Sequence, residues 1–200
     1  MNSERFSDDL IIVDYTDFHQ RHPDEKVPSE GVCFIDKPDN RLGAFYILNP
    51  KKHSYEAINL EANPGLVTDE QGRPVKQCEC ICRAERERGK RWALLLELKY
   101  CTEENIPDNM QNAFLKLDSC YDFLVRKKFF ADYPYRIYWV ISHPEHETIQ
   151  PFSNFINNQD RLLGLNDKGI NFIYSNAIKI LTPEYLIKSE IPRRYQSTQP

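Results

Sequence analysis

The run Trp92-Ala-Leu-Leu-Leu-Glu-Leu-Lys-Tyr-Cys101 has the pattern of a β-strand with two charges set near its end. A segment this apolar suits a strand that is covered by structure on both faces. Because side chains alternate across a strand, we expect Glu97 and Lys99 on one face and Leu98 on the other. Burying a carboxylate and an ammonium group is costly unless they are paired or bind something. The two charges therefore indicate either an ordinary ion pair at a strand end or a metal-binding carboxylate beside a catalytic lysine.

The residues before this run add a second strand. Residues 75–83 have a strand-like pattern, and a charged turn over residues 84–91 leads from them into the Trp92 run. Glu79 and Glu97 lie roughly symmetrically about that turn, so an antiparallel hairpin would bring the two acids near each other. The register stays open, because the turn can contain a bulge.

Three cysteines alternate along the first of these strands: Cys78, Cys80 and Cys82. Alternation predicts that they share the face opposite Glu79. A zinc site is disfavoured, because alternate strand positions lie about 6–7 Å apart and zinc ligands usually come from turns. We predict that all three are buried free thiols that pack as small hydrophobic side chains.

Helices and strands alternate after the hairpin. Helical spacing runs from about Pro107 to Phe130, and residues 135–142 have a strand pattern. Residues 152–165 have the pattern of a helix, and residues 170–174 and 177–181 look like late strands. The predicted class is α/β (α+β), with a mixed central β-sheet flanked by helices.

The amino-terminal third is less regular. Residues 31–36 and 43–48 both look like strands, and the turn residues between them predict a hairpin. Residues 10–14 fit a short strand or the start of a helix, and residues 53–62 fit either state.

Composition places bounds on the function. The chain has 200 residues, enough for one domain with a substantial core, and 28% of them are charged, as in ordinary globular proteins. The net charge of −4 gives no global positive field for nucleic acid. Residues 83–91 nevertheless carry five positive and two negative side chains, which suit either a solvated turn or a steering contact to a nucleic-acid backbone.

Location can also be predicted from composition. The amino terminus is polar and acidic, unlike a signal peptide, and no apolar run is long enough to cross a membrane. The six cysteines follow no pattern of a small secreted domain. We therefore expect a cytoplasmic protein with reduced thiols and no membrane association.

The two strands over 75–83 and 92–100, followed by the helix, resemble the core of the PD-(D/E)xK nuclease superfamily. In that family an acid on one strand precedes an E-x-K or D-x-K on the next. Glu97-Leu98-Lys99 matches the E-x-K, and Glu79 falls where the first acid is expected, although the family usually has Asp there. Cys78 replaces the proline of the family name.

The helix of the resemblance carries a further question. Some members of the family keep a glutamine on the helix that follows the two strands. Gln111 is on the predicted helix, but Lys116 lies nearer to the expected place, so no role is assigned to either. The resemblance implies a nuclease-like core over about 75–181, with residues 10–62 as an amino-terminal hairpin elaboration of the single domain 1–200.

The resemblance also implies a chemistry. Glu79 and Glu97 would hold Mg²⁺ or Mn²⁺, with the Leu98 carbonyl as a candidate third oxygen ligand. Lys99 would orient or activate water, or hold the scissile phosphate. The expected function is cleavage of DNA, in preference to RNA, by Glu79, Glu97 and Lys99.

A second class of function stays open at this stage. The same fold can serve without catalysis as a nucleic-acid-binding or assembly subunit, either as a homodimer or with a partner protein. The glutamate at position 79 and the acidic net charge favour this class, whereas the intact E-x-K favours the nuclease. His143-x-x-His146 fits a loop beyond a strand better than a metal site, and the chain has no phosphate-binding glycine loop.

Overall fold

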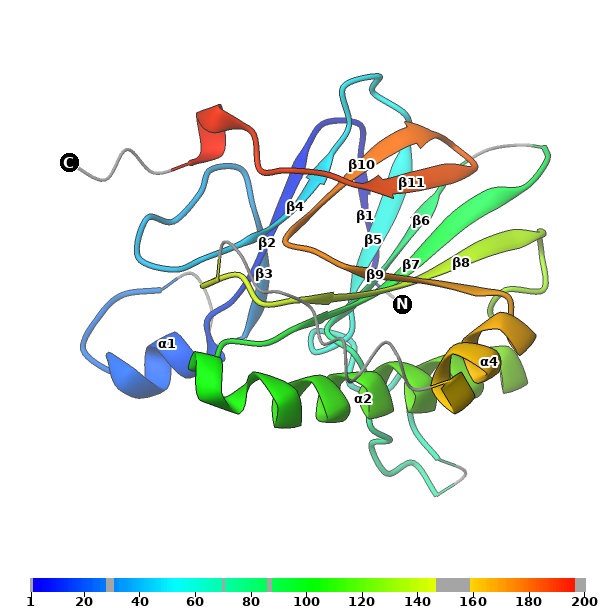
Figure 1. The fold of residues 1–200 in the computed structure, drawn as a ribbon, viewed down its shortest axis with the longest axis horizontal. Helices are drawn as coiled ribbons and strands as arrows, with labels where there is room; N and C mark the ends of the chain where they lie inside the picture. Colours follow the sequence, from blue (N-terminus) through cyan, green and yellow to red (C-terminus); the bar gives the residue numbers. More distant parts are fainter. Residues whose placement is uncertain (1, 28–30, 70, 86–87, 147–158, 197–200) are drawn as a thin grey trace.

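The computed structural model describes residues 2–27, 31–69, 71–85, 88–146 and 159–196. Two mixed β-sheets pack face to face, and Figure 1 shows helices α2 and α4 on the outer face of the larger sheet. This arrangement confirms the α+β class and the mixed central sheet. The helices cover one face of that sheet, and the second sheet covers the other.

The larger sheet has six strands in the order β1-β5-β6-β7-β8-β9. The strands from β1 to β7 pair antiparallel, whereas β7, β8 and β9 run parallel. The apolar run of the sequence is β7, at the centre of this sheet, and its antiparallel pairing with β6 confirms the predicted hairpin. The bounds are β1 Glu4–Phe6, β5 Tyr55–Asn59, β6 Cys80–Ala84, β7 Arg91–Leu98, β8 Tyr135–Ser142 and β9 Ile170–Tyr174.

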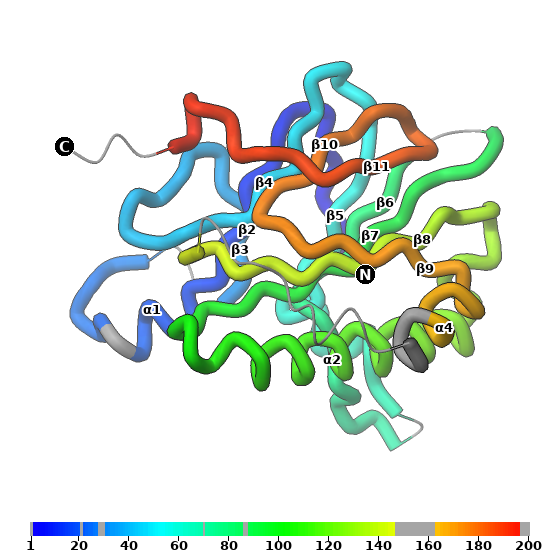
Figure 2. The backbone as a smooth tube through the Cα atoms, in the orientation of Figure 1, coloured from blue at the N-terminus to red at the C-terminus, as the bar shows by residue number. Residues whose placement is uncertain are grey.

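The smaller sheet has five strands in the order β11-β10-β4-β2-β3. It combines strands from both ends of the chain, and Figure 2 shows β10, in orange, beside β4, in blue, with which it pairs parallel. The bounds are β2 Leu10–Asp14, β3 Val32–Ile35, β4 Phe45–Leu48, β10 Ala177–Thr182 and β11 Tyr185–Lys188.

The predicted hairpin of residues 31–36 with 43–48 is wrong. These residues do form β3 and β4, but β2 lies between them and pairs antiparallel with both. The first four residues of β2 are buried, so this strand needs covering neighbours on both edges as well as on both faces. The expected amino-terminal elaboration is also built differently, because β5 belongs to the larger sheet while β2, β3 and β4 belong to the smaller one.

Three helices are described: α1 Thr16–Arg21, α2 Ile106–Arg126 and α4 Gln159–Asp167. Short 3-10 turns form η1 Glu103–Asn105 and η2 Arg193–Tyr195. The long helix confirms the predicted helical spacing, and a proline in its first turn fits the free amide positions there. The predicted helix over 152–165 is present from Gln159, and its residues 152–158 lie outside the described part. None of the described helices is long and apolar enough to cross a lipid bilayer.

Apolar side chains fill the space on both faces of β7. Trp92, Leu94 and Leu96 face the smaller sheet, where they meet Phe45 and Ile178. Alternate residues of the same strand face α2, which contributes a buried stripe. Because both faces are covered, a polar side chain at the end of β7 is buried among apolar side chains. The residues that line the α2 side include Ala93, Leu95, Met110, Ala113 and Leu117.

Candidate active site

The two predicted acids meet where β6 begins and β7 ends. The Glu79 amide donates to the Leu96 carbonyl at 3.0 Å, and the Glu79 carbonyl accepts from the Leu60 amide at 3.0 Å. These bonds hold Glu79 in the sheet just before β6 and beside Glu97 of β7. The structure thus brings Glu79, Glu97 and Lys99 together on the face of the sheet that α2 covers.

Two lysines form ion pairs with these acids. The Lys99 Nζ atom lies 2.5 Å from Glu97 Oε1, and the Lys116 Nζ atom lies 2.7 Å from the same oxygen. Lys116 also lies 3.3 Å from Glu79 Oε1, so its ammonium bridges the two carboxylates. The side chain of Glu97 is fully buried and that of Glu79 is 6% exposed, whereas that of Lys116 is 34% exposed. Solvent therefore reaches the cluster from the side of Lys116.

One oxygen of the cluster has no partner. Glu97 Oε2 is buried and accepts no hydrogen bond within the described part of the chain. Buried polar atoms in folded proteins are nearly always paired, with protein, water or an ion. An unpaired carboxylate oxygen in a buried acidic pair is therefore a candidate ligand for a cation or a water molecule.

The cluster shifts the ionisation of its members. Burial, followed by the nearby Glu97 carboxylate, raises the pKa of Glu79 to about 8, against the opposing effect of Lys116. Burial by itself would lower the pKa of Lys116, but the Glu97 and Glu79 carboxylates outweigh it and raise that pKa. Without a metal ion, Glu79 therefore holds a proton at pH 7, while the Lys99 ammonium lies against Glu97.

Lys116 is the residue of this site to which the sequence assigned no role. It comes from α2, one turn before the buried Cys120, while Gln111 is exposed on the same helix. Its position beside a buried helical stripe was readable from the spacing. The rotation of α2 that brings its ammonium to Glu79 depends on packing against the sheet, which no local pattern specifies.

A histidine lies at the end of β8, the strand that pairs with β7. His143 directly follows β8, and its ring is fully buried. Its Nδ1 atom lies 3.0 Å from the hydroxyl oxygen of Tyr174, while Nε2 has no hydrogen-bond partner in the described residues. Asn176 fixes the backbone by accepting from the His143 amide and donating to the His143 carbonyl. Burial, with His146 and Lys99 nearby, lowers the pKa of His143 to about 4, so the ring is neutral at pH 7.

The cysteine prediction is right on burial and wrong on orientation. Cys78, Cys80 and Cys82 are buried and free of disulfides. Cys80 and Cys82 face the smaller sheet, but Cys78 faces α2, where its sulfur lies 3.7 Å from that of Cys120. The regular strand begins only at Cys80, so alternation does not extend back through the bend at Glu79.

Neither the grouping of possible metal ligands nor comparison with known proteins indicates a function. Among the residues that the structure describes, no three His, Cys, Asp or Glu side chains are grouped so that they could share a metal ion. The chain matches no protein-family model, no curated protein and no solved structure.

Proposed function

We propose that this chain is a metal-dependent nuclease of the PD-(D/E)xK type, which hydrolyses phosphodiester bonds in DNA. The observation that carries the proposal is the convergence of Glu79, Glu97 and Lys99 where β6 begins and β7 ends, with an unpaired buried oxygen on Glu97. Buried carboxylates and lysines that perturb one another are typical of functional sites.

The donor set suits a hard divalent cation. Glu79 and Glu97 offer carboxylate oxygens, the ligand type that Mg²⁺ and Mn²⁺ prefer. Such an ion would supply Lewis-acid stabilisation of phosphate charge and a bound water of lowered pKa. With both acids ionised, the two ammonium groups already balance the cluster, so a divalent ion fits only if Lys116 withdraws. Lys116 is the more exposed of the two lysines, and its flexible stem allows that movement.

The residues of the chain would then have distinct roles. Lys99, held against Glu97, would contact the scissile phosphate and orient the attacking water. Glu79 would give up its proton when a cation replaces the Lys116 ammonium, because opposite charge nearby favours the ionised form. The apolar side chains around the end of β7 would keep bulk water from the reacting groups.

One observation favours the second class of function. Lys116 occupies the space between the two carboxyl groups, so an ammonium group already stands where a metal ion would bind. A site closed by an internal cation could be purely structural, and the protein would then be a nucleic-acid-binding or assembly subunit of the same fold.

The decisive experiment is a cleavage assay. Plasmid and single-stranded DNA are incubated with the protein in Mg²⁺, Mn²⁺ or EDTA, alongside Glu97→Gln, Lys99→Ala and the matched surface variant Lys188→Ala. We expect metal-dependent cleavage by the wild type and by Lys188→Ala, which changes an exposed lysine of β11. Glu97→Gln and Lys99→Ala should lose it.

Metal binding separates the two classes of function. Millimolar Mg²⁺ or Mn²⁺ should raise the melting temperature of the wild type, because a ligand that binds only the folded state stabilises it. The rise should shrink in Glu97→Gln and persist in Lys99→Ala, which removes a competing positive charge. An unchanged melting temperature together with no cleavage would leave the subunit as the preferred function.

A further inference from the structure

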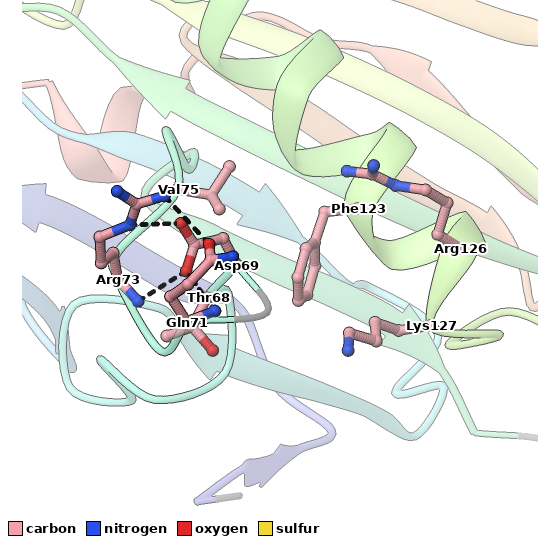
Figure 3. A pocket seen from close by; sticks show the side chains of 8 residues that line it. All are labelled: Thr68, Asp69, Gln71, Arg73, Val75, Phe123, Arg126 and Lys127. Atoms are coloured by element: carbon pink, nitrogen blue, oxygen red, sulfur yellow. Dashed lines mark hydrogen bonds and ion pairs between the residues drawn. The ribbon is translucent and has the colours of Figure 1, made fainter.

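A pocket of about 500 Å³ lies away from the Glu97 site, between the loop before β6 and the carboxyl end of α2. Its volume is within the range of small-ligand sites. Figure 3 shows Phe123 and Arg126 of α2, with Lys127 directly after the helix, on the side of the pocket that faces the loop. The lining residues are Thr68, Asp69, Gln71, Arg73, Val75, Phe123, Arg126 and Lys127.

The pocket and the Glu97 site lie on one line along α2. Lys116, Cys120, Phe123 and Lys127 follow helical spacing and so form one stripe of the helix. The segment that leads into β6 runs beside this stripe in the opposite direction. Glu79 meets Lys116, Cys78 meets Cys120, and Val75 lines the pocket with Phe123.

The rise of the helix sets the separation. Ten residues of α2 between Lys116 and Arg126 span about 15 Å, at about 1.5 Å per residue. A nucleic-acid strand advances about 3.4 Å per nucleotide in a stacked conformation, so this distance corresponds to about four nucleotides. A strand held at the Glu97 site is therefore long enough to reach the pocket with a nearby phosphate.

Two cations of the pocket have no acidic partner in the described part of the chain. Asp122, one turn before Arg126, forms an ion pair with Lys168 instead, and the Lys168 Nζ atom lies 2.9 Å from Asp122 Oδ1. Arg126 donates from Nε only to the Asp122 carbonyl, and the Lys127 ammonium lies 5.6 Å from the Phe123 ring centre.

The other charges of the pocket cancel. Arg73 is bound to Asp69 through an ion pair of 2.7 Å, so together they add no net charge. The pocket keeps an excess of two positive charges in a chain whose net charge is −4. A helix dipole favours basic residues at this end without any ligand, but it explains neither the facing loop nor the concavity between the two walls.

We propose that this pocket binds a backbone phosphate of the same nucleic-acid strand that the Glu97 site acts on, about four nucleotides from the scissile bond. The inference rests on the proposed function for its ligand class. Arg126 and Lys127 supply the charge, and Thr68 lines the opposite wall.

Binding of fluorescent single-stranded DNA tests the inference without cleavage. The full chain in EDTA is titrated into a 12-nucleotide strand and a trinucleotide at several salt concentrations. Arg126→Ala/Lys127→Ala is compared with Lys188→Ala/Arg193→Ala, a matched loss of two exposed charges. Lys188 is in β11 and Arg193 is in η2. Melting curves establish that both variants fold.

We expect Arg126→Ala/Lys127→Ala to bind the 12-nucleotide strand about tenfold more weakly, while its log–log salt slope falls by about 0.7 for the one lost phosphate contact. Binding of the trinucleotide should weaken less, because a trinucleotide is too short to contact the pocket and the Glu97 site at the same time. Arg126→Lys/Lys127→Arg keeps the charges and should restore binding of the long strand.

The outcomes separate this inference from the proposed function. Equal loss for both charge-pair variants, no loss for either, or an equal loss for the short and the long strand would overturn it, even in a protein that cuts DNA. A protein that cuts nothing, but loses only long-strand binding when Arg126 and Lys127 change, would retain the pocket and refute the nuclease.

Discussion

Glu79→Gln should stabilise the metal-free protein at neutral pH. The folded-state pKa of Glu79 is about 8, against an ordinary value of 4.5, so the folded chain keeps a proton that the unfolded chain has lost. Stability from this proton is fully present below pH 4.5 and is lost as the pH rises toward 8. The loss is about 1.4 kcal/mol per pH unit, which amounts to about 3 kcal/mol at pH 7.

Glutamine removes this loss because it does not ionise. Its amide brings two donors next to the Lys116 ammonium, and leaving them without acceptors costs about 1 kcal/mol. The expected net gain at pH 7 is therefore about 2 kcal/mol, or about 4–8 °C in melting temperature for a chain of this size. At pH 4 wild-type Glu79 is protonated in both states, so the substitution should be neutral or slightly destabilising.

The assay is chemical denaturation of both proteins in EDTA between pH 4 and pH 8. Glu56→Gln is the matched control, because Glu56 is a buried acid on β5 that forms an ion pair with Arg83. That substitution breaks the pair and should destabilise the fold at both ends of the pH range. Two results would refute the raised pKa of Glu79: a variant no more stable than the wild type at pH 7, or an equal gain in stability at pH 4 and pH 7.

Three further predictions use other parts of the structure. Lys116→Met should strengthen Mg²⁺ stabilisation of the fold, measured by melting temperature, because it removes the ammonium between the carboxylates; weaker stabilisation would contradict the bridging role. The folded-state pKa of His143 is about 4, so nitrogen NMR spectra should show a neutral ring above pH 5. The free energy of unfolding should fall by about 3 kcal/mol as the pH drops from 6.5 to 4. Protonation of the ring near pH 6.5 would refute its burial. Leu94→Ala should cost about 2–5 kcal/mol in denaturation experiments, since Leu94 is fully buried between the sheets; a cost under 1 kcal/mol would contradict that packing.

The sequence was informative where the pattern was local and long. The alternation of residues 92–99 was sufficient to place Glu97 and Lys99 on one face, although β7 itself ends at Leu98 and Lys99 directly follows it. The hairpin with β6 followed from a single turn, so the sequence alone predicted that Glu79 lies near Glu97.

Pairing between distant segments was not predictable in the same way. β2 enters between β3 and β4 because its buried residues need partners on both edges, and no turn signal records that choice. Cys78 turned away from the expected face because a bend precedes β6, and alternation has no meaning outside a regular strand. Lys116 reached the acids through the rotation of α2, which is set by packing with the sheet.

The parallel pair of β4 and β10 has a consequence for folding order. Tyr46 of β4 is aligned with Ala177 of β10, about 130 residues later. During synthesis, β2, β3 and β4 can pair early, but the outer edge of β4 has to wait for the last part of the chain. Contacts at such long range slow folding, and an open strand edge is a template for aggregation. A chain truncated before residue 177 should therefore expose the outer edge of β4 and aggregate. The native fold can form only after β10 has been synthesised and has paired with β4.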